Sequence, residues 1–190
     1  MAVRPITQIG APVLRQRARE VTAAELASPA LQALIDDLID TMHDARGAGL
    51  AAPQLGEPVR VVVIEVPAEP PHPYRPPIPL TVLVNPVLTA VDDERFAHAE
   101  GCLSVPVLRG LVSRAGRVRV QAWDRHGAAI DEVVVGLTAA TYQHEVDHLD
   151  GVLFVDRVDP RTLATMAEFE RHQLPGVIAA ARAVVARLGG

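Results

Sequence analysis

The sequence predicts an α+β fold, in which antiparallel or mixed β-sheets pack around a central helix and further helices lie toward both ends of the chain. Helical periodicity occurs near residues 28–46 and again after residue 138, and strand-like apolar patterns lie between these segments. Strands that are segregated from helices along a chain are typical of α+β proteins, because βαβ units would alternate the two. The 190 residues suffice for one sizeable core, so we expect a single domain over residues 1–190.

Composition excludes several classes of protein. The net charge is −5 and all 18 basic residues are arginines, which argues against a generally basic nucleic-acid binder. The chain has no run of about 18 apolar residues, so we expect no membrane span, and residues 1–10 lack the apolar stretch of a signal peptide. Cys102 is the one cysteine, so an intramolecular disulfide cannot form. We therefore expect a cytoplasmic protein that binds neither nucleic acid nor membranes.

The first predicted helix covers residues 28–46. Ser28 is a typical N-cap, Pro29 suits the first turn, and Gly47 can end the helix. Its apolar residues recur at helical spacing, so we expect one face to pack on the core. These residues are Leu31, Leu34, Ile35, Leu38, Ile39 and Met42.

Four segments in the middle of the chain are predicted strands. Residues 60–66 contain four consecutive apolar residues and indicate a buried strand, and residues 80–88 are a second candidate. Residues 117–123 alternate between apolar and polar, which predicts a strand with one buried face. Residues 130–135 are expected to pair back on that strand through a turn at 125–127.

The segment 67–79 contains seven prolines. Proline lacks the N–H that a strand or helix interior needs, so we interpret this segment as a surface excursion. A lid or a docking element is the alternative.

The last third of the chain is predicted to be helical. Residues 138–150 form one helix, and Asp159 with Pro160 opens another that runs to about residue 172. Pro175 and Gly176 are expected to break that helix, which leaves a short terminal helix over about 177–188.

His144, Glu145 and His148 form the pattern His-Glu-x-x-His within the predicted helix 138–150. Residues four apart lie on the same side of a helix, so both imidazoles can reach one metal ion. Glu145 projects beside them, where it could handle the proton of a metal-bound water. The alternative is a chance pattern on an amphipathic helix.

A catalytic metal site usually has a third protein ligand, for which there are two candidates. Cys102 lies in the run Glu-Gly-Cys-Leu-Ser, and Glu168 follows His148 at a separation compatible with thermolysin-like metallopeptidases. Helical periodicity places Glu168 on the side opposite Met166, toward solvent. We therefore favour Cys102, although a lone cysteine is more often a small buried apolar residue.

Residues 47–54 read Gly-Ala-Gly-Leu-Ala-Ala-Pro-Gln. The two glycines allow close approach of another backbone. The segment follows a helix instead of a strand, so it is not a dinucleotide-binding fingerprint. By itself it would be a helix C-cap and loop, with Gln54 as an ordinary polar residue.

Together these three segments resemble the peptide deformylase family. The family pattern Gly-x-Gly-Leu-Ala-Ala-x-Gln matches residues 47–54, Glu-Gly-Cys-Leu-Ser matches 100–104, and Gln-His-Glu-x-Asp-His-Leu-x-Gly matches 143–151. Their order and spacing also fit the family, and the resemblance spans the chain to about residue 158.

The resemblance implies a metal-dependent hydrolase. Cys102, His144 and His148 would hold one divalent ion per chain, Fe²⁺ in many family members, with Zn²⁺, Ni²⁺ or Co²⁺ as substitutes. Glu145 would take a proton from the attacking water and pass it to the leaving amine. The implied reaction removes the N-formyl group from the N-terminal methionine of newly synthesised polypeptides and releases formate.

The resemblance also implies roles in substrate binding. The side-chain amide of Gln54 and the backbone N–H of Leu103 would stabilise the oxyanion that forms from the formyl group. Other residues would hold the peptide in an extended pose or line its side-chain pocket. These residues are Gly47, Gly49, Glu100, Gly101, Arg109 and Leu137.

The sequence departs from the family around the pocket for the first side chain. Ala48, Ala140 and Thr141 stand where relatives often carry larger or more apolar residues, and His98 replaces a residue that is often apolar. We predict a roomier and more polar pocket, with His98 on its rim instead of acting as a fourth ligand.

Two acidic residues are predicted to support the metal site. Glu100 should be partly buried near the metal and paired with Arg114 or Arg109. Asp147 is expected to orient a ligand or to have a purely structural role.

Two further functions remain as alternatives. One is a zincin-type metallopeptidase that uses Glu168 as third ligand, and the other is a non-catalytic paralogue that binds formyl-peptides. As partners we expect nascent formyl-methionyl peptides. In the family the C-terminal end can contact the ribosome near the peptide exit, where Arg182 and Arg187 are the basic residues available here.

Overall fold

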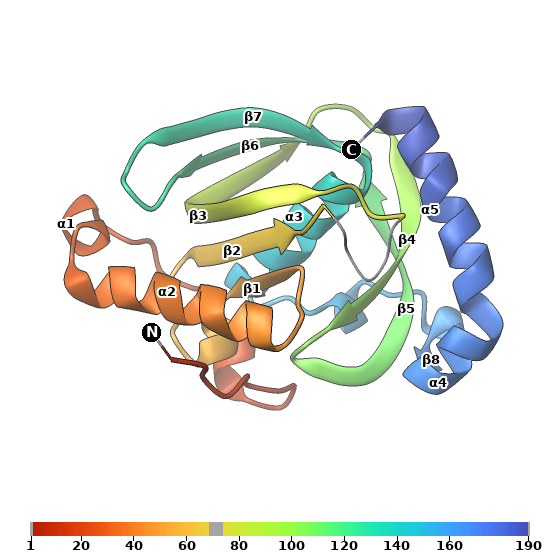
Figure 1. Cartoon of the computed structure of the whole chain (residues 1–190), viewed down its shortest axis with the longest axis horizontal. Coiled ribbons are helices and arrows are strands. Elements are labelled where there is room, and N and C mark those ends of the chain that lie inside the picture. Colours follow the sequence, from red (N-terminus) through yellow and green to blue (C-terminus); the bar gives the residue numbers. More distant parts are fainter. Residues whose placement is uncertain (1, 69–73, 190) are drawn as a thin grey trace.

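The computed structural model describes residues 2–68 and 74–189 and confirms an α+β fold with antiparallel sheets. Helix α3 (Gly136–Leu149) contacts strands of a five-stranded and of a three-stranded sheet, and it lies near the centre of the molecule (Figure 1). Helices α2 (Pro29–Asp44) and α5 (Leu174–Leu188) pack on the outside, toward the two ends of the chain. No helix in the described ranges has the length and hydropathy needed to cross a membrane.

The larger sheet has the strand order β1-β2-β3-β6-β7, and every neighbouring pair is antiparallel. The predicted strands 60–66, 117–123 and 130–135 are confirmed to within one residue, and the predicted strand 80–88 is extended at both ends. The turn at 125–127 joins β6 to β7 as predicted. The strands are β1 (Gly49–Ala51), β2 (Val61–Val66), β3 (Ile78–Ala90), β6 (Arg117–Trp123) and β7 (Ala129–Val135).

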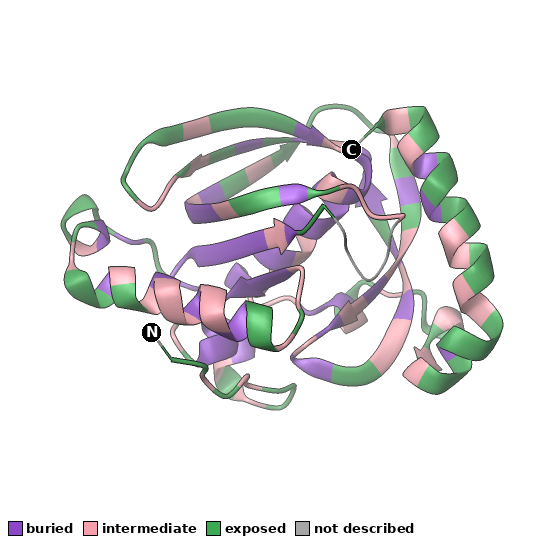
Figure 2. Cartoon of the chain, in the orientation of Figure 1, coloured by how far each residue is buried: buried purple, intermediate pink, exposed green. Residues whose placement is uncertain are grey.

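Strand β2 is apolar except for Glu65, because both faces of Val61–Ile64 are covered. Val61 and Val63 belong to the cluster that contains the buried face of α2, whereas Val62 and Ile64 pack with residues of α3. Successive side chains of a strand point to opposite faces, so a strand between two helices needs apolar residues at consecutive positions. Figure 2 shows β2 and most of α3 as buried.

Helix α2 confirms the prediction for residues 28–46. The Ser28 side chain accepts a hydrogen bond from the Leu31 N–H at 3.2 Å, and Pro29 occupies the first turn. The helix ends at Asp44, and Arg46 adopts a left-handed φ of 52° that turns the chain toward β1. Shorter helical segments nearby are η1 (Pro12–Arg15), α1 (Ala23–Leu26) and η2 (Ala52–Leu55).

The smaller sheet was not predicted from the sequence. Strands β4 (Arg95–Cys102) and β5 (Val105–Ala115) form a tight hairpin, and β8 (Ala164–Thr165) pairs with β5. Glycines and polar residues interrupt the apolar alternation of both long strands, which hides the period of two. The hairpin places Cys102 at the end of β4, beside α3.

The predicted helix 160–172 is wrong over its first half. A 3₁₀ turn, η4 (Pro160–Thr162), is followed by β8, in which Thr165 pairs with Leu108 of β5. Asp159 caps only that turn, by accepting a hydrogen bond from a backbone N–H two residues further on. Pairing with β5 holds this part of the chain extended, and such a long-range contact overrides the local helical signal.

The predicted break at Pro175 and Gly176 is also wrong. The segments α4 (Met166–Glu168), η5 (Phe169–Gln173) and α5 follow one another without interruption. Pro175 lies in the first turn of α5, directly after the π-helical turn η5. The altered hydrogen-bond pattern of that turn lets the helix continue although proline has no N–H to donate. Another short helical segment, η3 (Phe154–Asp156), follows α3.

A buried arginine ties the end of α3 to the larger sheet. The Nη1 group of Arg60 donates to the carbonyl of Leu149 at 3.3 Å and to the Asp150 carboxylate at 2.7 Å. Its Nη2 group donates to the carbonyl of Pro86 at 3.2 Å. Arg60 is only 6% exposed, so these carbonyls depend on the guanidinium for their hydrogen bonds.

We predict that Arg60→Met lowers the free energy of unfolding by about 2–4 kcal/mol, because it leaves buried acceptors unpaired. Chemical denaturation at neutral pH measures the change. Arg17→Met is the matched control, since the side chain of Arg17 is 78% exposed and its contact with Asp150 is long, at 3.8 Å. A loss no larger than that of the control would contradict the prediction.

Candidate active site

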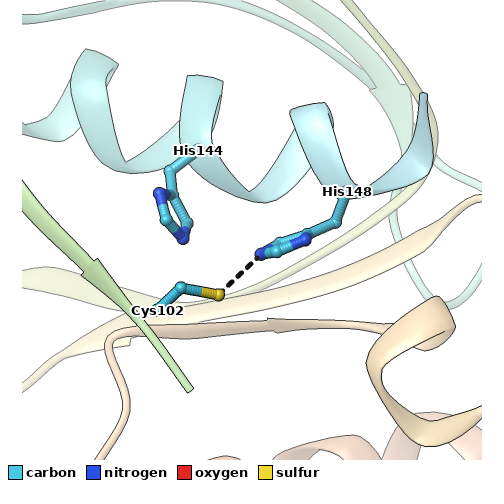
Figure 3. Close-up of side chains that lie close together, drawn as sticks. All are labelled: Cys102, His144 and His148. Carbon is cyan, nitrogen blue, oxygen red and sulfur yellow. Dashed lines mark hydrogen bonds between the residues drawn. The ribbon is translucent and has the colours of Figure 1, made fainter. Parts of the chain in front are cut away.

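The side chains of Cys102, His144 and His148 converge in the space between α3 and the end of β4 (Figure 3). One potential ligand atom from each residue lies within 4.8 Å of the others, and this is the single such group among the described residues. Cys102 Sγ lies 3.3 Å from His148 Nε2, and the two imidazole centroids are 5.1 Å apart. Strand β4 supplies the thiol, and successive turns of α3 supply the imidazoles.

The chemistry of this group fits a divalent cation. One thiol and two imidazoles are the donors that Zn²⁺ and Fe²⁺ prefer among protein side chains. Burial lowers the pKa of His148 well below its ordinary value, which keeps this ring in the neutral form that can act as a ligand. His148 is 1% exposed and Cys102 is 7% exposed, so a cation held here would be shielded from bulk water.

Glu100 and Arg114 form a buried ion pair that orients His144. Arg114 Nε and Nη2 donate to the two carboxylate oxygens of Glu100, at 2.7 and 2.9 Å. The same carboxylate lies 2.8 Å from His144 Nδ1, which leaves the Nε2 edge of the ring for Cys102. Burial alone would raise the pKa of Glu100, but the hydrogen bonds with His144 and Arg114 hold it well below its usual range.

The partner of Glu100 is therefore Arg114, one of the two arginines that the sequence suggested. Arg109 lies instead over Gly101. Its Nη1 atom occupies the space beside this glycine, where a Cβ would lie only 1.5 Å away. Asp147 accepts a hydrogen bond from Arg114 at 2.6 Å. It therefore helps to fix the guanidinium that binds Glu100.

Glu145 is buried directly beside β1. A Cβ at Gly49 would lie 2.5 Å from the carboxyl carbon of Glu145, so only glycine leaves room for this carboxylate. Burial raises the pKa of Glu145 to about 7, and its Oε2 atom has no hydrogen-bond partner. A carboxyl group with a pKa near neutrality can both accept and donate a proton.

Gln54 is held with its amide nitrogen toward the thiol. Its Oε1 atom accepts a hydrogen bond from the Ala51 N–H at 2.8 Å, and its Nε2 donates to Ser104 Oγ at 3.1 Å. The same nitrogen lies 3.7 Å from Cys102 Sγ. Ser104 is fully buried, and sequence reasoning gave it no role although it belongs to a recognised motif.

A cleft of about 340 Å³ opens beside these groups. It brings together nearly all of the residues that the sequence indicated for binding and catalysis, and Leu103 lies in its wall. The exceptions are His148, which is 1% exposed, and Leu137, which is 2% exposed and packs in a hydrophobic cluster with Phe96 and α5 because α5 covers that side of α3. The indicated residues in the wall are Gly47, Ala48, Gly49, Gln54, His98, Glu100, Gly101, Cys102, Leu103, Arg109, Ala140, Thr141, His144 and Glu145.

Sequence reasoning did not indicate Arg46, Arg75 and Met166, which also line the cleft. Arg75 lies within the proline-rich segment 67–79, where no periodicity marks a side chain as inward-facing. Part of that predicted surface excursion, residues 69–73, lies outside the described residues.

Glu168 differs from the candidate ligands in its exposure and in its partners. Its side chain is half exposed, and it pairs with Arg171 at 3.1 Å and with His172 at 3.2 Å on the helix surface. It does not belong to the Cys-His-His group. The expectation that it faces solvent is confirmed.

Comparison with known proteins identifies the family. Residues 3–164 match the model of the family described as polypeptide deformylase. The chain is 45% identical over 157 residues to peptide deformylase 1 of Nitrosomonas europaea, which covers 83% of this chain and 88% of the relative. It is 46% identical over 168 residues to peptide deformylase 1 of Streptomyces coelicolor, which covers 86% of this chain and 77% of the relative.

Solved structures give the same result. A class I type b peptide deformylase from Acinetobacter baumannii, with Met-Ala-Ser bound, matches with a TM-score of 0.79 and 39% identity, over 83% of this chain and 99% of that one. The peptide deformylase of Thermotoga maritima matches with a TM-score of 0.73 and 35% identity, over 84% of this chain and all of that one. With its sequence matched over residues 3–164 and its fold shared with these enzymes, the chain belongs to the polypeptide deformylase family.

Proposed function

We propose that this enzyme removes the N-formyl group from the N-terminal methionine of newly synthesised polypeptides and releases formate. The observation that carries the proposal is the convergence of Cys102, His144 and His148 beside the buried carboxyl of Glu145. The Acinetobacter relative binds Met-Ala-Ser, a peptide with the free N-terminal methionine that deformylation leaves. The 39% identity with that relative supports the same class of product here.

Cys102, His144 and His148 would hold the cation, with Fe²⁺ as the first candidate and Zn²⁺, Ni²⁺ or Co²⁺ as substitutes. A divalent cation held there supplies Lewis acidity to the reacting carbonyl and to water. Glu100 contributes by fixing the ring of His144, since it lies 2.8 Å from Nδ1. Cys102 would supply the sulfur ligand, and a cysteine sulfur in such a site is open to oxidation.

Glu145 would move the proton. Its unpartnered Oε2 accepts a proton from the attacking water and then delivers it to the amine nitrogen as the C–N bond of the formamide breaks. Its raised pKa suits both halves of this transfer. Gly49 keeps the carboxyl free of steric contact while the substrate lies along β1.

Gln54 and Leu103 would stabilise the oxyanion. The Nε2 group of Gln54 donates toward the developing negative charge. The hydrogen bond from the Ala51 N–H to Oε1 keeps the amide from flipping. The backbone N–H of Leu103 is the second proposed donor. Gly47, Gly101 and Arg109 would hold the peptide main chain.

We also propose a cytoplasmic location, because the substrate arises during translation. Docking on the ribosome near the peptide exit would use the outer face of α5, where Arg182 is exposed. Arg187 on the same helix lies 3.6 Å from Glu94, so Arg182 is the freer of the two charges.

Removing the thiol tests the ligand set. We predict that Cys102→Ala weakens cation binding by more than the roughly 100-fold that loss of an outer partner costs, because one of three ligands is gone. Metal analysis after anaerobic purification and a formate-release assay measure the effect. Glu168→Ala is the control and should keep both the bound cation and the formate-releasing activity. Loss of the cation in that variant would favour a metallopeptidase instead.

Removing the carboxylate separates catalysis from binding. We predict that Glu145→Gln keeps the cation and binds formyl-methionyl peptides, while formate release slows by about 10²–10⁴-fold. The surface variant Glu168→Gln should be as active as the wild type. If Glu145→Gln releases formate at the wild-type rate, the proton-transfer role is wrong. If the wild type itself only binds the peptides, the protein is a non-catalytic paralogue.

A further inference from the structure

Arg75 reaches from the proline-rich segment 67–79 into the cleft. Its Nη2 group donates a hydrogen bond to Thr141 Oγ1 at 2.9 Å, and the Thr141 hydroxyl donates in turn to the carbonyl of Leu137 at 3.0 Å. Thr141 lies about one helical turn before Glu145 on α3. The guanidinium is thereby fixed in the cleft wall, close to the groups that would carry out the reaction.

Arg75 has donors to spare. A guanidinium carries five N–H donors, and Thr141 accepts a single hydrogen bond from it. No carboxylate of the described residues forms an ion pair with Arg75. Of the two acidic side chains in the cleft wall, Glu100 is bound to Arg114 and His144, and Glu145 packs against β1. Burial lowers the pKa of Arg75, which reflects the cost of holding this charge away from water.

The wall around Arg75 is polar where an apolar pocket would be expected for methionine. His98 lines the same cleft, and burial lowers its pKa to about 4, so its imidazole is neutral at physiological pH. Ala48 and Ala140 are small apolar members of the cleft wall, which also includes the larger Leu103, Val107 and Met166. A hydrocarbon side chain would cover these polar groups without pairing with them, which costs binding energy.

We propose that Arg75 is a specificity-determining residue that donates a hydrogen bond to an acceptor atom near the tip of the substrate's first side chain. The preferred substrates are formyl-peptides with an acceptor-bearing first residue, so that methionine sulfoxide ranks above methionine and methionine above norleucine. Norleucine has the same length as methionine with a methylene in place of sulfur. Thioether sulfur is a weak acceptor, whereas the sulfoxide oxygen is a strong one. This inference rests on the proposed deformylase function.

The test compares three formyl-X-Ala-Ser peptides, in which X is norleucine, methionine or methionine sulfoxide. The ratio of kcat/KM for the sulfoxide over norleucine should be about tenfold in the cation-loaded wild type, the size expected for one hydrogen bond. Arg75→Met keeps the length of the side chain without the donors and should bring the ratio to one or below. Arg75→Lys keeps a cationic donor and should retain part of the preference. Arg17→Met, on the exposed surface, should match the wild type.

The affinities of the deformylated products X-Ala-Ser, measured by calorimetry, provide a second readout. They should follow the same order in the wild type and lose it in Arg75→Met. Equal rates for all three formyl-peptides, or a ratio that survives in Arg75→Met, would overturn the role of Arg75 while leaving the deformylase activity intact. If no peptide yields formate from enzyme of verified cation content, the proposed function fails, and the affinity order then decides on the role of Arg75 alone.

Discussion

The buried guanidinium of Arg114 is the interaction on which the active site depends. It binds both oxygens of Glu100 on β4 and one oxygen of Asp147 on α3, and it thereby joins the smaller sheet to the central helix. Burying such charges is tolerated only when every partner is present, because an unpaired one costs several kcal/mol. The strand and the helix are therefore locked in the one register that sets Cys102 opposite His144.

Small residues then decide where reactive groups can come close to the main chain. The bare Cα of Gly49 lets the carboxyl of Glu145 lie against β1, where burial brings its pKa to about 7. The bare Cα of Gly101 lets the guanidinium of Arg109 lie over the strand that carries Cys102. In both places the glycine is a spatial requirement of a neighbouring charged side chain, as well as a source of flexibility.

The cleft combines a family framework with an unusual wall. Gln54 and Cys102 lie on rigid elements, and each is fixed by further hydrogen bonds, which is how binding and catalytic groups hold their geometry. Arg75 enters from a segment without regular structure and is fixed by one hydrogen bond to Thr141. Because one face of α3 carries both Thr141 and Glu145, substrate selection and proton transfer are built on the same helix.

The sequence by itself determined the helices expected at 28–46 and 138–150, the paired strands at 117–123 and 130–135, and the His-Glu-x-x-His spacing, because each follows from a local period or a cap. It could not reveal the β4–β5 hairpin, whose alternation is interrupted by Gly101 and other residues of the site. It left two candidate partners for Glu100 and gave no sign of Arg75. Only the tertiary structure decided these points, because a side chain's partner across the core depends on how separate elements pack, and local periodicity carries no information about that packing.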